Sequence, residues 1–184
     1  MDQRNIKDTD IQRAKRLNGE NFIGNDILIT NMRDMPIPDG ARRMNFIFVT
    51  LCTRGEARYT VDTQEQTVKK NDVIIISERH VVADYKKSPD IDGMCVIMSV
   101  KFFYETISSV GDISVMFLFS KNHPVVSLTE KEVDTFTGYF EMLKSKVADT
   151  QNHFRRELAR TIMLTMFYDC LLYTSPSPRD PKTS

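Results

Sequence analysis

The segment Phe46-Ile47-Phe48-Val49 lies inside a longer stretch, residues 42–53, that has the composition of a β-strand. A strand with one buried face alternates apolar and polar side chains. A strand that is apolar on both faces must be covered on both sides. We therefore predict a barrel whose outer surface also meets a helix or a partner.

Short strand-like segments, separated by turn residues, lie on either side of this stretch. Gly55 ends it, and a hairpin follows around Thr63-Gln64-Glu65, with a further turn at Lys70-Asn71-Asp72. The other predicted strands are residues 22–30, 57–62, 66–69, 73–77, 81–85 and 94–100. Many short strands with turn signals between them indicate a sandwich or a barrel.

The second half of the chain has helical periodicity. Short helices are predicted over 102–107 and 113–119, separated at Gly111. A longer helix begins at Thr129, because Glu132 three residues later completes a capping box. Its apolar stripe consists of Val133, Phe136, Phe140, Leu143 and Val147, and this stripe packs either on its own barrel or on a partner.

The last predicted helix follows a cap at Asn152 and has a broad apolar face. We expect four residues of this face to contact a second copy of the chain: Phe154, Leu158, Ile162 and Met166. Met163, Leu164 and Phe167 widen the face beyond what a solvent-facing helix needs, which is the reason for this expectation. The alternative is that the face packs only on its own barrel.

The composition excludes several classes of protein. The 184 residues include 25 basic and 25 acidic side chains, so a formal net charge of zero provides no broad basic field for non-specific nucleic-acid binding. Cys52, Cys95 and Cys170 form no CxxC pair, and reduced thiols favour a cytoplasmic location. We expect no signal peptide in the polar first twenty residues and no membrane association, because no apolar run reaches ~18 residues.

We predict no catalytic residues, no metal site and no cofactor. The three histidines, His80, His123 and His153, form no HxH or HxxxH pair that could begin a metal site. GxSxG, Walker and GxGxxG motifs are absent from the sequence. The pair Arg42-Arg43 could bind an anion, although a solvated strand end is the commoner role for such a pair.

Residues 21–169 resemble the N-terminal cupin-type sensor domain of AraC-family transcription regulators. The resemblance rests on residues 51–65, 71–77 and 122–129, and residues 152–158 extend it into the last helix. It implies a mainly β fold with C-terminal α structure: a cupin-like double-stranded β-helix, or jelly-roll barrel, followed by a helical pair.

Catalytic cupins carry two motifs that supply their metal ligands. In register with Gly55, the two histidine positions and the glutamate position of the first motif hold Arg42, Met44 and Phe48. The fixed positions of the second motif, G-x5-P-x-G-x2-H-x3-N, hold Asn71, Ser77, Arg79, Val82 and Lys86. Every ligand position is replaced, which disfavours a metal-dependent cupin enzyme.

The resemblance implies four regions along the chain. These are a polar, partly helical segment (1–20), the barrel (21–101), a helical dimerisation region (102–170) and a tail (171–184). Residues 171–180 of the tail, LLYTSPSPRD, resemble translated sequencing-adapter read-through, and we expect the tail to be non-native and disordered. We expect the natural protein to continue into a domain with two helix-turn-helix motifs that is missing from this chain.

By this resemblance, the chain is part of a bacterial, cytoplasmic regulator. Its barrel binds an unknown small-molecule effector, its helices form a homodimer, and DNA is bound only through the missing domain. The candidate pocket residues are Phe46, Phe48, Tyr59 and Val61, although such residues fill a closed barrel equally well. The alternatives are a metal-free cupin enzyme, such as a sugar isomerase or epimerase that uses His80, and a ligand-free dimerisation module.

Overall fold

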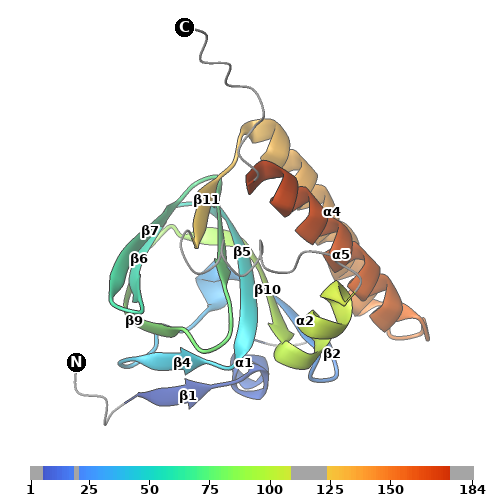
Figure 1. Cartoon of the computed structure of the whole chain (residues 1–184), viewed down its shortest axis with the longest axis horizontal. Helices are drawn as coiled ribbons and strands as arrows, with labels where there is room; N and C mark the ends of the chain where they lie inside the picture. The colour runs from blue at the N-terminus through green and yellow to red at the C-terminus, as the bar shows by residue number, and fades with distance from the viewer. Residues whose placement is uncertain (1–5, 19–20, 109–123, 175–184) are drawn as a thin grey trace, which may run out of the picture.

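The computed structural model describes residues 6–18, 21–108 and 124–174 (Figure 1). Within these ranges, side chains are described except at 13, 16–18 and 170–174. The predicted helix over 113–119 and His123 lie outside the described residues, as do residues 175–184 of the predicted tail.

Two β-sheets face each other across the interior of the barrel. In the described part of the chain, one sheet has the order β1 (Lys7–Thr9), β4 (Arg42–Met44), β9 (Val81–Lys87), β6 (Glu56–Val61), β7 (Gln64–Lys69). The other has the order β11 (Val125–Ser127), β8 (Asp72–Ile76), β5 (Phe46–Arg54), β10 (Asp92–Ser99), β3 (Ile27–Asn31), β2 (Phe22–Ile23). Only the pairing of β1 with β4 is parallel among the pairs of these strands.

Strand β5 is buried on both of its faces, as its sequence predicts. Ile47, Val49 and Leu51 point into the apolar layer beneath the helices. Phe46 and Cys52 belong to the core inside the barrel, and Phe48 packs against that core. The six-stranded sheet therefore separates two apolar cores, one inside the barrel and one under the helices.

Helices α2 (Val100–Ile107), α4 (Glu130–Ala148) and α5 (Arg155–Thr174) cover the outer face of this sheet. Figure 1 shows α4 and α5 as a pair lying along one side of the barrel. The predicted capping box of α4 is confirmed, since the Thr129 amide donates to Glu132 Oε2 at 2.6 Å and the Glu132 amide to Thr129 Oγ1 at 3.4 Å. Its stripe packs inward: Phe136, Phe140, Leu143 and Val147 are buried, and Val133 is partly buried.

Arg156 ties the last helix to the barrel. Its Nε lies 2.7 Å from Asp26 Oδ2, in the turn between β2 and β3, and its Nη2 lies 2.5 Å from Glu105 Oε2 on α2. The guanidinium also lies 5.2 Å from the centre of the Phe102 ring. The hydrogen bond from Arg156 lowers the pKa of Glu105, as expected for a carboxylate held by a cation.

Several predicted boundaries differ from those of the structure. The strand expected over 22–30 is broken by a turn after Ile23, and the strand expected over 42–53 is split at Asn45. The hairpin turn is at Asp62 and Thr63, where φ is 48° and 77°, one residue before the predicted position. Two-residue hairpin loops with positive φ at both positions match the strand twist, which explains the shift.

Regular structure reaches further toward both ends of the described chain than the sequence predicts. β1 pairs with β4, so part of the segment 1–20 adds a strand to the barrel, and α1 (Ile11–Asn18) follows it. At the other end, α5 continues to Thr174, past the predicted start of the tail at Leu171 and close to Pro176, where proline cannot continue a helix.

The turn between β5 and β6 requires glycine. Gly55 has φ of +75°, in the left-handed region that side chains disfavour. A Cβ atom there would lie 2.5 Å from Ser88 Oγ and 2.8 Å from Ile91 Cα. The close approach of the 88–91 turn thus fixes the point at which the chain passes from one sheet to the other.

Phe167 and its neighbour Tyr168 test the packing of α5. The Phe167 ring packs edge-to-face on Phe103 of α2, with 5.4 Å between ring centres, whereas Tyr168 is exposed. Phe167→Ala should lower the free energy of unfolding by about 3–5 kcal/mol, because it opens a cavity in the helix layer. Tyr168→Ala should change it by about 0.5 kcal/mol or less. Urea denaturation measures both, and equal effects would contradict this packing.

Candidate functional site

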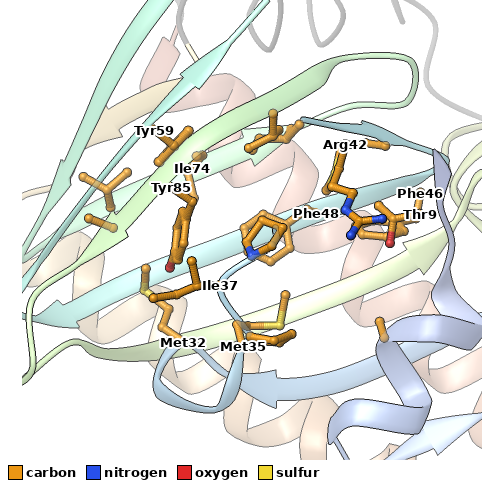
Figure 2. A pocket seen from close by; sticks show the side chains of 18 of the residues that line it. Thr9, Met32, Met35, Ile37, Arg42, Phe46, Phe48, Tyr59, Ile74 and Tyr85 are labelled. Atoms are coloured by element: carbon orange, nitrogen blue, oxygen red, sulfur yellow. The ribbon is translucent and has the colours of Figure 1, made fainter. Parts of the chain in front are cut away.

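A cavity of about 270 Å³ lies between the two sheets (Figure 2). Its walls come from strands of both sheets, from β1 and α1, and from the segment 32–39 that follows β3. The lining residues are Thr9, Ala14, Met32, Met35, Pro36, Ile37, Pro38, Asp39, Arg42, Met44, Phe46, Phe48, Ala57, Tyr59, Val68, Ile74, Ile76, Val82 and Tyr85. The wall is predominantly apolar, as in most small-molecule sites.

Three of the four predicted pocket residues line this cavity. Phe46 and Phe48 come from β5, and Tyr59 comes from β6 in the opposite sheet. Val61 is buried in the same core but does not line the cavity. The alternation of side chains along the two strands therefore places these residues on the inward faces of the barrel.

Arg42 is the unexpected member of the wall. The sequence favours a solvated Arg42-Arg43 pair, and Arg43 is exposed, but Arg42 is only 4% exposed. The two side chains point to opposite faces of β4 because side chains alternate along a strand. Arg42 Nη2 donates to Asp39 Oδ1 at the rim, whereas Nη1 has no hydrogen-bond partner.

The ion pair with Arg42 stabilises the ionised form of Asp39. The hydrogen bond from Arg42 lowers the pKa of Asp39, whose side chain is largely exposed to solvent. Lys7 Nζ, on β1, lies 4.0 Å from the other carboxylate oxygen. Among the residues that line the cavity, Arg42 and Asp39 are the charged ones.

Two tyrosines supply the other polar groups deep in the wall. The rings of Tyr59 and Tyr85 are 6.1 Å apart between centres, and the buried Tyr59 hydroxyl has no hydrogen-bond partner. Burial raises the pKa of Tyr59, and it raises the pKa of Tyr85 to about 12. Both hydroxyls therefore stay protonated at neutral pH and can donate hydrogen bonds.

The segment 32–39 forms one border of the cavity and is held by two long side chains, Lys87 and Arg33. Lys87 Nζ donates to the carbonyls of Arg33 and Met35, each at 2.8 Å, and Arg33 pairs with Asp92. Ile37 lines the cavity yet is 56% exposed, so it marks the side that opens to solvent.

The sequence register with catalytic cupins assigns four ligand positions to residues that line this cavity. Arg42, Met44, Phe48 and Val82 occupy the four ligand positions assigned by the sequence register, and all four line the cavity. A guanidinium, a thioether and two hydrocarbon side chains are not a metal-binding set. The described residues contain no group of three His, Cys, Asp or Glu side chains that could hold a metal ion. The same register could have identified Arg42 as a cavity residue.

His80, the acid–base candidate of the enzyme alternative, is not in the cavity wall. Its Nδ1 lies 2.5 Å from Asp62 Oδ2, and the other Asp62 oxygen accepts from the Val81 amide at 2.9 Å. The hydrogen bonds of Asp62 therefore join the β6–β7 turn to the start of β9. His153 is exposed just before α5.

The four dimer candidates lie in different environments. Ile162 and Met166 are buried inside the chain, in the layer between α5 and the six-stranded sheet. Leu158 is partly exposed, and Phe154, just before α5, is 70% exposed. The broad apolar face of α5 is thus covered largely by its own chain, and Phe154 is the candidate most accessible to a second copy.

Several solved structures have folds similar to that of this chain. The AraC-like transcriptional activator CuxR aligns over 85% of this chain and 55% of its own, with 16% identity and a TM-score of 0.50. ToxT of Vibrio cholerae (K231A, apo) aligns over 83% of this chain and 56% of its own, with 11% identity and a TM-score of 0.48. The cupin domain of Schizosaccharomyces pombe Cnp3 aligns over 48% and 64%, with 14% identity and a TM-score of 0.31.

This chain therefore spans little more than half the length of these two regulators. No protein-family model and no curated protein sequence matches it. The predicted fold class is confirmed: a cupin-like, mainly β barrel followed by C-terminal helices, of the kind found in AraC-like regulators. None of the helices described is long and apolar enough to cross a membrane.

The cysteines of the barrel provide a test of its interior. Burial raises the pKa of the Cys52 thiol to about 11 and that of Cys95 to about 12, so both are protonated at mildly alkaline pH. We expect iodoacetamide to leave both unmodified in the folded protein and to modify both in urea, as read by peptide mass spectrometry. Comparable labelling rates in the two conditions would contradict the closed barrel.

Proposed function

We propose that this chain is the effector-sensing and dimerisation part of an AraC-family transcription regulator. The observation that carries the proposal is an apolar cavity whose wall includes the six-stranded sheet on which the helices pack. A small molecule bound there would alter the sheet that supports α4 and α5.

The route from cavity to helices is short. On β5, Phe46 and Phe48 line the cavity while their neighbours Ile47 and Val49 belong to the helix layer. Ile74 and Val73 have the same arrangement on β8. Because close-packed cores transmit small displacements, an effector that repositions these strands would shift the population of helix arrangements.

The cavity favours binding over catalysis. Its titratable side chains are Arg42, Asp39, Tyr59 and Tyr85, and Asp39 is already paired with Arg42. Both tyrosine hydroxyls are held protonated by burial, and His80 is elsewhere. A metal-free isomerase needs an acid–base pair that titrates near neutral pH, and this wall offers none. We therefore propose a non-enzymatic role.

The remaining parts of the proposal concern the parent protein. The aligned part of this chain covers little more than half of the regulators to which the fold is similar, so DNA binding is assigned to a domain beyond it. Dimerisation is assigned to the helical side, where Phe154, Met142 on α4 and Tyr168 on α5 are exposed apolar residues. A cytoplasmic location follows from the same role.

Effector binding should raise thermal stability. In a thermal-shift screen of sugars, carboxylates and other small metabolites, a ligand at about 100 times its Kd adds ~2.7 kcal/mol, which is roughly 5–11 °C for a chain of this size. Ala57→Leu, which fills the cavity from β6, should abolish the shift, whereas Ala148→Leu on the exposed end of α4 should leave it unchanged. A screen without hits would instead favour a ligand-free dimerisation module.

Dimerisation should depend on Phe154. We expect the chain to sediment as a dimer at high micromolar concentration and Phe154→Ser to shift it toward monomer, because an exposed aromatic anchor is lost. Ile37→Ser, an exposed apolar residue at the cavity instead of on the helices, is the matched control. Only monomer for the unmodified chain would contradict this part of the proposal.

A further inference from the structure

Two buried polar groups in the cavity wall lack hydrogen-bond partners: Arg42 Nη1 and the Tyr59 hydroxyl. Among the described side chains, Thr50 Oγ1 is the third such buried atom, and it does not line the cavity. Buried polar groups without partners are rare because they forfeit their hydration. Two of them on one apolar cavity indicate that a bound molecule completes their hydrogen bonds.

The two groups are set apart across the five-stranded sheet. Arg42 on β4 pairs with Val82 on β9, and Val82 pairs with Val61 on β6, two residues beyond Tyr59. Two strand spacings separate β4 from β6, which is about 10 Å. In Figure 2, Arg42 and Tyr59 lie on opposite sides of the cavity with Phe48 between them. A ligand that meets both must be polar at its two ends and apolar between them.

The charge of the wall favours a monoanion. A guanidinium donates N–H hydrogen bonds to carboxylates, and one nitrogen of Arg42, Nη1, is buried without a hydrogen-bond partner. The other terminal nitrogen of Arg42, Nη2, donates to Asp39. The exposed Asp39 carboxylate balances part of the positive charge of Arg42. A doubly charged group would find no second cation among the lining residues.

The size of the cavity suits a small ligand. A volume of about 270 Å³ can hold a compact molecule with about ten or more non-hydrogen atoms. Phe46, Phe48, Ile74 and Ile76 would contact its apolar middle.

We propose that the cavity binds a small carboxylate that has an apolar body and a hydroxyl group at its far end. The carboxylate accepts a hydrogen bond from Arg42 Nη1, and the hydroxyl pairs with the hydroxyl of Tyr59. This inference rests on the proposed sensing function and names the chemical class of its effector.

Isothermal titration calorimetry on the full chain tests the charged end. The probes are para-hydroxyphenylpropionate and its amide, which differ in charge and little in size. We expect the carboxylate to bind at least about tenfold more tightly, as for other hydrogen bonds between charged groups. Arg42→Met should remove this preference while retaining binding of the amide, which reports that the variant is folded.

Two further variants serve as controls for Arg42→Met. Arg43→Met removes the exposed neighbouring cation and should keep the full preference. Arg42→Lys keeps a cation at the buried position and should retain part of the preference, even if Arg42→Met fails to fold. Equal affinities for acid and amide in the unmodified chain, or a preference that survives in Arg42→Met, would overturn the charged end of the proposal.

The far end is tested with phenylpropionate, which lacks the hydroxyl. It should bind the unmodified chain several-fold more weakly than para-hydroxyphenylpropionate does. In Tyr59→Phe, the two compounds should bind with similar affinities. A hydroxyl effect that is absent from the unmodified chain, or unchanged in Tyr59→Phe, would overturn this part. If neutral compounds from the metabolite screen bind without any preference for carboxylates, this inference fails while the sensing function stands. If no compound binds, both fail.

Discussion

Burial of β5 on both faces is the constraint on which the rest of the structure depends. Each alternate side chain of this strand enters a different apolar core, with Phe46 inside the barrel and Ile47 under the helices. The hydrophobic effect therefore requires both the opposite sheet and the helix layer to be present at once. The helices are accordingly part of the stable fold, and the barrel cannot lose them without exposing the outer face of its central sheet.

The same arrangement leaves a cavity where close packing would otherwise be expected. Filled cores are dense, and an unfilled space with unpartnered polar atoms on its wall weakens the fold. Arg42 makes this cost larger, because a charge is held in an apolar wall with one of its terminal nitrogens unpaired. Retaining such a group is reasonable where it serves recognition, as the proposed effector site requires.

The helix layer also explains the breadth of the apolar face on α5. Four apolar residues of this face are buried within the chain: Ile162, Met163, Met166 and Phe167. Arg156 adds charged contacts to α2 and to the β2–β3 turn. The helix pair is thus joined to the barrel by both apolar and ionic contacts. A change at the sheet would move α4 and α5 together as one layer, as the proposed sensing function requires.

Local sequence patterns identified most of the barrel strands, the capping box at Thr129, the stripe on α4 and the inward faces that carry Phe46, Phe48 and Tyr59, because each depends on residues close in the sequence. It did not distinguish the core of the chain from a dimer contact on α5, since an apolar face does not reveal what covers it. Nor did it identify Arg42 as a cavity residue, because a charged side chain at a strand end is usually solvated. Tertiary structure alone decided that Arg42 and Tyr59, from strands separated by β9, meet the same cavity while Arg43 faces the solvent.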